Sequence, residues 1–183
     1  METKRKKVLA ISGSTRKNST NTHVLEWISK LTHDQFEIKF FTHMDNLPHF
    51  NPDLDDKNVP DLIVELRSEI EQADGVIICT PEYVFSLPGA LKNTLEWTVS
   101  STVFSDKPVA LITASGLGEK ASEQLSLIMS TLGAHFDQQT ELLIQGARSK
   151  VDADKIDPIT RQNLVDLINA FNDQITFKLA TIG

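Results

Sequence analysis

Short apolar runs alternate with longer amphipathic segments along this chain. Three runs are apolar at every position, a fourth alternates apolar and polar residues, and a fifth begins with a charged residue. They are 8–11, 76–79, 109–112, 36–41 and 141–144. Continuous apolar runs indicate strands buried on both faces, as in parallel sheets. The pattern therefore predicts five strands, most of them in the interior of a sheet.

Between these runs, apolar residues recur at three- and four-residue spacing, as on the buried face of a helix. The predicted helices are 22–31, 60–73, 88–100, 121–132 and 158–175. Pro60 and Pro158 are expected in a first helical turn, and Leu91, Leu95 and Val99 are expected to face the sheet. Alternation of strands and helices predicts a doubly wound α/β fold, in one domain spanning 1–183.

Unusual loops follow the first, third and fourth predicted strands, at 13–21, 81–88 and 115–118. Ligands of doubly wound sheets bind beyond the carboxyl ends of the strands, so these loops are expected to meet at one site. The connection 43–59 carries two prolines and four aspartates. A connection of that length is usually either functional or mobile.

The composition of the chain excludes several classes of protein. The net charge of −7 argues against DNA or RNA as a partner, because phosphate backbones need clustered Lys and Arg. No apolar run approaches the roughly 20 residues of a membrane helix, and none fits a signal peptide. The single cysteine, Cys79, excludes an internal disulfide and fits a reducing compartment. These features predict a cytoplasmic protein.

The first loop has the chemistry of an anion site. Its donors are hydroxyls, amides and one guanidinium. They belong to Ser12, Ser14, Thr15, Ser19, Thr20 and Thr22, to Asn18 and Asn21, and to Arg16. They surround a predicted helix N-terminus, which itself favours anions. Gly13 is the only glycine in this loop, which excludes the dinucleotide fingerprint and the P-loop. These donors suit a terminal phosphate better than a bridging pyrophosphate. The alternative is a polar loop with a Ser or Thr N-cap.

The second loop is framed by Pro81 and Pro88, which stiffen it. It carries Tyr83, Val84 and Phe85, which could cover a planar ring, while backbone groups read the polar edge of that ring. In the third loop, the two glycines permit close approach of a ligand, or a tight turn alone.

Two motifs resemble the NADPH-dependent FMN reductases, which have a flavodoxin-like fold. They read Gly13-Ser14-x-Arg16-x-x-Ser19-x-Asn21 and Pro81-Glu82-Tyr83-x-x-Ser86-x-Pro88-Gly89-x-Leu91-Lys92-Asn93. The similarity covers about 7–134. It implies a five-stranded parallel sheet of order 2-1-3-4-5 with helices on both faces. It also implies FMN as cofactor, with NADPH or NADH as co-substrate.

The resemblance assigns roles by position. The FMN phosphate is expected on Ser14, Arg16, Ser19, Asn21 and Thr22. The flavin ring is expected against Pro81, Glu82, Tyr83 and the backbone of Val84, with Ser115, Gly116 and Gly118 nearby.

The sequence departs from the family pattern at three positions. Val84 stands where the family usually has Asn, and Leu117 and Glu119 stand where it usually has Gly. A carboxylate at Glu119 would disfavour the extra phosphate of NADPH, so the choice between NADH and NADPH stays open.

The implied reaction passes a hydride from nicotinamide to FMN and then reduces a small-molecule acceptor by a ping-pong mechanism. Quinones, free flavin and azo compounds are the expected acceptors, and the resemblance implies a homodimer or homotetramer. No protein nucleophile is expected, and the five histidines lack metal-site spacing. Two alternatives remain: a flavodoxin-type electron carrier, and a chain that has lost its flavin.

Overall fold

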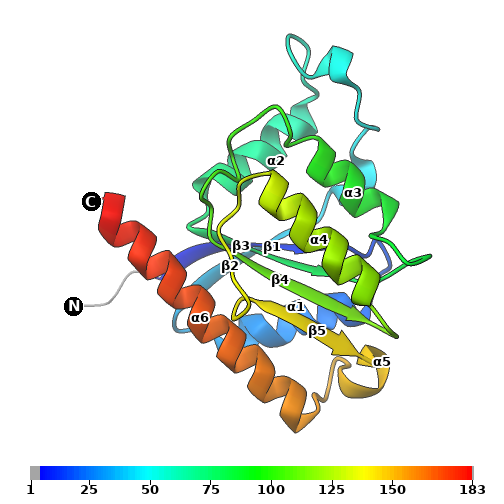
Figure 1. The fold of residues 1–183 in the computed structure, drawn as a ribbon, viewed down its shortest axis with the longest axis vertical. Helices are drawn as coiled ribbons and strands as arrows, with labels where there is room; N and C mark the ends of the chain where they lie inside the picture. Colours follow the sequence, from blue (N-terminus) through cyan, green and yellow to red (C-terminus); the bar gives the residue numbers. More distant parts are fainter. Residues whose placement is uncertain (1–4, 183) are drawn as a thin grey trace.

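A computed structural model describes residues 5–182 of the chain. Five strands form one parallel sheet in the order β2-β1-β3-β4-β5 (Figure 1). The strands are β1 (Lys6–Ser12), β2 (Phe36–Phe41), β3 (Gly75–Thr80), β4 (Val109–Ser115) and β5 (Glu141–Gln145). The predicted flavodoxin-like fold and its strand order are confirmed.

Helices cover both faces of the sheet (Figure 1). They are α1 (Thr20–Leu31), α2 (Asp61–Gln72), α3 (Gly89–Glu96), α4 (Glu119–Thr131), α5 (Ala147–Lys150) and α6 (Pro158–Ile182), with 3-10 turns η1 (Met44–Asn46) and η2 (Pro52–Leu54). One core lies between the sheet and α2, α3 and α4, and the other between the sheet and α1, α5 and α6.

The central strand β3 explains the apolar run that predicted it. Every residue of β3 is buried, and successive side chains alternate between the two cores. Val76 and Ile78 contribute to one core, whereas Ile77 and Cys79 contribute to the other. Continuous apolarity thus follows from burial on both faces.

Three details of the helices differ from expectation. Pro60 precedes α2 rather than lying in its first turn, because its ψ of 143° is extended. Helix α3 ends at Glu96, so Val99 lies beyond it and is exposed rather than facing the sheet. The short helix α5 was not predicted, because four residues are too few to display a helical period.

The long connection 43–59 is held against α3. The Asn93 amide donates to the Pro48 carbonyl at 2.9 Å and accepts from the Phe50 N–H at 2.8 Å. The Trp97 indole donates to the same Pro48 carbonyl at 2.8 Å. Arg67 also pairs with Asp55. Trp97 is fully buried and belongs to the core on this face of the sheet.

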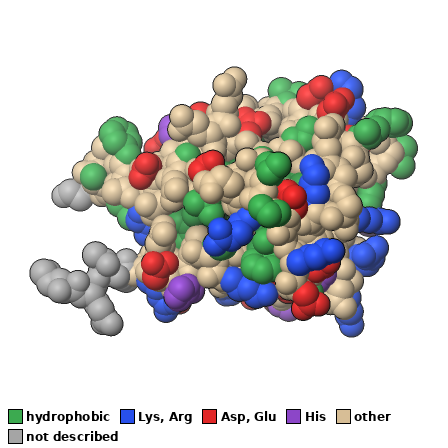
Figure 2. Space-filling view, turned by 90° about the horizontal axis from the view of Figure 1, so that it is seen from below, with side chains coloured by type: hydrophobic (Ala, Val, Ile, Leu, Met, Phe, Trp, Pro, Cys, Tyr) green, Lys and Arg blue, Asp and Glu red, His purple; other side chains and the backbone are tan. Residues whose placement is uncertain are grey.

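The surface adds two observations. None of the described helices has both the length and the apolar character needed to cross a membrane. On the face seen in Figure 2, Lys and Arg side chains are interspersed with Asp and Glu.

Candidate functional site

The first loop is fixed at both ends before it reaches α1. The Gly13 N–H donates to the Cys79 carbonyl at 2.7 Å. A Cβ at Gly13 would lie 2.6 Å from the Thr80 hydroxyl oxygen, so only glycine fits between β1 and β3. Ser19 caps α1 by accepting from the Thr22 N–H at 3.1 Å. Ser19 is therefore an N-cap, as the alternative predicted. A helix N-terminus also leaves further backbone N–H groups without partners inside the helix.

Asn21 is positioned by Cys79. The Cys79 thiol donates to the Asn21 Oδ1 at 3.2 Å, and both side chains are buried. Burial raises the pKa of the Cys79 thiol, so it stays a neutral donor. Because Oδ1 is the acceptor in this pair, the Asn21 Nδ2 is the group left to donate to a ligand.

The second loop folds as a two-residue hairpin. Tyr83 and Ser86 exchange backbone hydrogen bonds of 2.9 and 3.1 Å. Val84 and Phe85 between them have φ of 52° and 55°, a left-handed backbone that such hairpin turns require but that disfavours bulky residues. Val84 is 96% exposed and Phe85 66% exposed, so burial does not offset the strain.

Gln124 of α4 anchors this hairpin. Its side chain accepts from the Ser86 hydroxyl at 2.8 Å and donates to the Phe85 carbonyl at 3.3 Å. The stiffness expected from the two flanking prolines is therefore reinforced by a contact that is remote in sequence.

Glu82 joins the second loop to the third. Its N–H donates to the Ser115 hydroxyl at 3.1 Å. Its carboxylate accepts from the N–H groups of Gly118, Lys120 and Ala121 at 3.2, 2.9 and 3.0 Å. Gly118 is the N-cap of α4 and has no side chain to offer, so Glu82 supplies the cap.

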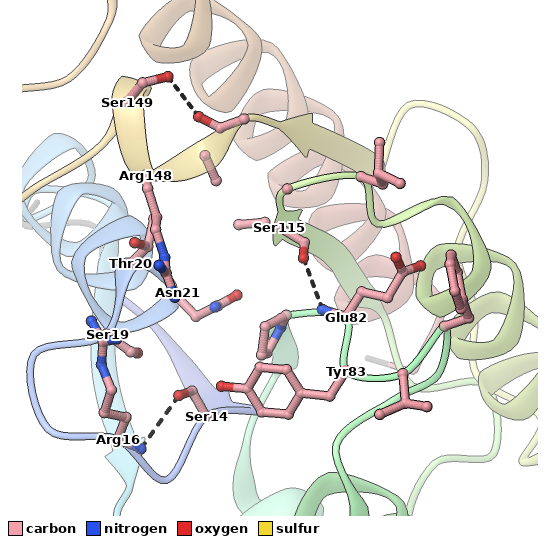
Figure 3. Close-up of a pocket in the computed structure, with 18 residues that line it drawn as sticks. Ser14, Arg16, Ser19, Thr20, Asn21, Glu82, Tyr83, Ser115, Arg148 and Ser149 are labelled. Atoms are coloured by element: carbon pink, nitrogen blue, oxygen red, sulfur yellow. Dashed lines mark hydrogen bonds between the residues drawn. The ribbon is translucent and has the colours of Figure 1, made fainter.

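The three loops enclose a cavity of about 720 Å³ at the carboxyl edge of the sheet (Figure 3). All the predicted site residues line it except Thr22 and Gly118.

The Thr22 hydroxyl instead lies 2.8 Å from the Ser19 hydroxyl, behind the cavity wall. Gly118 has a φ of 92°, and a Cβ there would lie 2.8 Å from Leu143 Cδ1, so it serves the turn. Glu119 does not line the cavity and accepts from Gln145 at 3.1 Å.

A fourth segment completes the wall. Gly146, Ala147, Arg148 and Ser149 line the cavity from the carboxyl end of β5, and none of them was predicted. The rule that singled out the loops after strands one, three and four applies equally to strand five. Gly146 directly after β5, with Arg148 two residues further on, was the available signal.

The cavity has two chemically different ends. One end presents Ser14, Arg16, Ser19 and Arg148 beside the N-terminus of α1, where an anion is favoured. The other end presents Tyr83, Val84, Phe85 and Leu117, which are all more than half exposed. Such a cavity suits an elongated ligand with an anionic group at one end and a flat apolar ring at the other. Residues 5–182 contain no cluster of side chains suited to a metal ion.

A family model for the NADPH-dependent FMN reductases matches residues 6–148. The chain belongs to this family. It is therefore an NAD(P)H-dependent oxidoreductase with FMN as its cofactor, and the flavodoxin-type electron carrier is set aside.

Similar proteins include members from several bacteria. The quinone reductase of Escherichia coli strain K12 is 30% identical over 177 residues, covering 92% of this chain and 94% of that protein. The NADH:(hydroxy)cinnamate reductase subunit CrdA of Vibrio ruber is 37% identical over 142 residues, covering 74% and 69%. The structure of FerB, an NAD(P)H:(acceptor) oxidoreductase from Paracoccus denitrificans, superposes with a TM-score of 0.81 at 28% identity, covering 93% and 97%.

The cavity fits the family's cofactor. FMN combines a terminal phosphate with a planar ring, which matches the anionic and apolar ends described above. Glycine is required at Gly13, where β1 meets β3, and this brings the first loop close to the third strand. The residues present are thus chemically suited to FMN.

Proposed function

We propose that this reductase transfers a hydride from NADPH or NADH to FMN and then reduces a flat acceptor, by a ping-pong mechanism. The observation that carries the proposal is the two-ended cavity, with cationic and hydroxyl donors at α1 and an exposed apolar hairpin opposite. Bound FMN supplies the redox chemistry, taking two electrons and a proton from the nicotinamide and passing them on. The protein residues bind and orient the reactants.

At the phosphate end, Ser14, Ser19 and Asn21 are assigned as donors and Arg16 as the counter-charge. Ser14, Ser19 and Asn21 are nearly fully buried, so their donors are already desolvated and positioned. Thr22 is assigned an indirect role, because its N–H and hydroxyl orient the Ser19 hydroxyl.

At the ring end, Pro81, Glu82, Tyr83 and the Val84 backbone are assigned to one edge of the ring. Ser115 and Gly116 are assigned to the other edge, with Gly118 shaping their turn. Glu82 is assigned to act through its backbone carbonyl, because its carboxylate is engaged with α4 and its N–H donates to Ser115. No protein residue is assigned a catalytic role.

The acceptor is proposed to be a quinone, a free flavin or an azo compound. The cavity mouth is bordered by Tyr83 and Leu117, and stacking on apolar surface tolerates many flat molecules. Donor and acceptor would then occupy the same ring face in turn, which is the physical basis of ping-pong kinetics. The quinone reductase named above supports the first of these acceptors.

The direct test is to purify the protein, titrate it with FMN and follow NAD(P)H oxidation with a quinone present. A yellow protein with parallel lines in double-reciprocal plots is expected. Replacing Arg16 with Ala should weaken FMN binding about 10-fold or more, because a charge-assisted contact is lost. Lys17→Ala is the matched control, since Lys17 is an exposed cation of the same loop outside the cavity wall. A protein that takes up no FMN would refute the proposal.

We also propose that the protein forms a homodimer or homotetramer in the cytoplasm. Val84 and Phe85 are exposed beside the cavity, and Leu127 is exposed one turn beyond Gln124, which anchors the hairpin. A second copy would cover this apolar surface. Light scattering should give a mass of two or four chains, and a monomer at micromolar concentration would contradict the proposal. The single buried free cysteine supports a reducing compartment.

A further inference from the structure

Arg148 reaches the cavity from an element that neither family motif includes. Gly146 turns the chain after β5 with a φ of 61°, and its N–H donates to the Gly116 carbonyl at 3.0 Å. Ala147 is then buried in the core beneath α1 and α6. These two anchors fix the start of α5, and the next residue, Arg148, lines the cavity.

The Arg148 side chain points towards the first turn of α1. Figure 3 shows it running from α5 towards Thr20 and Asn21, on the same side of the cavity as Arg16. The two arginines therefore approach the anionic end from different elements, one from the first loop and one from α5.

The charges at this end are not balanced by the protein. Within residues 5–182, neither Arg16 nor Arg148 forms an ion pair. Glu82 is the only acidic residue of the cavity wall, and its carboxylate is engaged by the N–H groups at the start of α4. Two uncompensated guanidinium groups in a chain of net charge −7 indicate a site for a doubly charged anion.

We propose that Arg148 is a second guanidinium ligand of the FMN phosphate, approaching it from α5 while Arg16 approaches it from the first loop. This inference rests on the proposed function, since it assigns the phosphate of the same cofactor. A terminal phosphate monoester carries close to two negative charges at neutral pH, which two arginines neutralise. Serine and backbone donors alone would leave that charge only partly compensated.

The test compares FMN with riboflavin, which has the same ring and ribityl chain but no phosphate. Apo-protein is titrated with each flavin, following the quenching of flavin fluorescence. Arg148→Ala should weaken FMN binding about 10- to 100-fold and change riboflavin binding less than about twofold. Arg148→Lys should fall between, because it keeps the charge but loses the bidentate geometry. Raising the salt concentration should weaken FMN binding less in Arg148→Ala than in the wild type.

Lys150→Ala is the matched control. Lys150 is the second cation of α5, and it lies outside the cavity wall. The substitution should leave both affinities unchanged. Arg148→Gln provides a second neutral variant of similar length in case Arg148→Ala perturbs α5.

Three results would overturn the inference. Equal losses of affinity for FMN and riboflavin would show that Arg148 contacts the flavin ring or is needed for folding. Unchanged FMN binding with an altered preference between NADPH and NADH would assign Arg148 to the co-substrate. Unchanged affinity for both flavins, with an unchanged preference between NADPH and NADH, would show that Arg148 has no role in binding. If the wild type itself binds neither flavin, the proposed function fails and not merely this inference.

Discussion

The carboxylate of Glu82 lies 3.0 Å from the backbone nitrogen of Ala121 and caps a helix that begins 37 residues further along the chain. Through this contact the hairpin that carries Tyr83 and the turn that carries Gly118 form one unit. The two walls at the ring end of the cavity are therefore mechanically coupled.

Replacing Glu82 with Ala should expose that coupling. We expect a loss of about 1–2 kcal/mol in the free energy of unfolding, because three N–H groups lose their acceptor. FMN affinity should fall as well, since the loops that hold the ring separate. Urea denaturation and flavin titration measure the two effects. Glu123→Ala, which removes a surface carboxylate of the same helix, should change neither. Equal effects of the two substitutions would show that the cap is unimportant.

Val84 should be a site where a polar residue increases stability. Val84→Asn should raise the free energy of unfolding by about 1 kcal/mol, because Asn tolerates a left-handed backbone that strains a β-branched side chain. Val99→Asn is the control, since Val99 is also exposed but has no positive φ. Thermal unfolding of the two variants compares them. A destabilised Val84→Asn protein would mean that Val84 makes contacts, for instance with a second copy, that outweigh its strain.

Cys79 should be inert towards thiol reagents in the native protein. It is fully buried, and burial raises its pKa, so almost no thiolate is available. Ellman's reagent should label about one thiol per chain in denaturant and none within the same time without denaturant. Labelling of the folded protein at the rate of a free thiol would contradict the buried Cys79–Asn21 pair.

Lys107 should make stability increase with pH in the alkaline range. Its ammonium donates to the carbonyls of Glu71 and Ala73 at 3.2 and 2.5 Å, at the end of α2. Burial lowers the pKa of Lys107 to about 8, with a smaller effect from Lys178. The folded chain therefore releases this proton near pH 8, whereas the unfolded chain holds it to about 10.5. Between these values the unfolded state binds more protons, so the contribution of Lys107 to stability rises with pH.

Urea denaturation of the wild type and Lys107→Met at several pH values isolates this contribution. The stability of the wild type relative to the variant should rise between pH 8 and 10.5 and be constant below pH 8. Lys17→Met, at an exposed position, should show no such trend. A difference that falls with pH would show that the carbonyl contacts outweigh burial.

The sequence predicted the strands well because their signal is local. A strand buried on both faces, such as β3, must be apolar at every position, and that is visible without knowledge of its neighbours. The clustering of the loops after β1, β3 and β4 followed from the parallel topology alone. Most of the predicted site residues line the cavity for this reason.

The remaining features depend on contacts between distant segments. The left-handed backbone of Val84 and Phe85 contradicts their local preference and is held by Gln124, some 40 residues away. The use of the Glu82 carboxylate as a helix cap depends on the position of α4. Arg148 lies on a helix of four residues, too short for a periodic signal. None of these could be derived from spacing along the chain.

The Pro48 carbonyl accepts hydrogen bonds from Asn93 and Trp97, residues 45 and 49 positions later. The ordered form of the connection 43–59 therefore depends on α3 being in place. Closing so long a segment carries an entropic cost that local contacts within it do not repay. The connection and α3 should form and open together, as one cooperative unit with matched amide exchange rates.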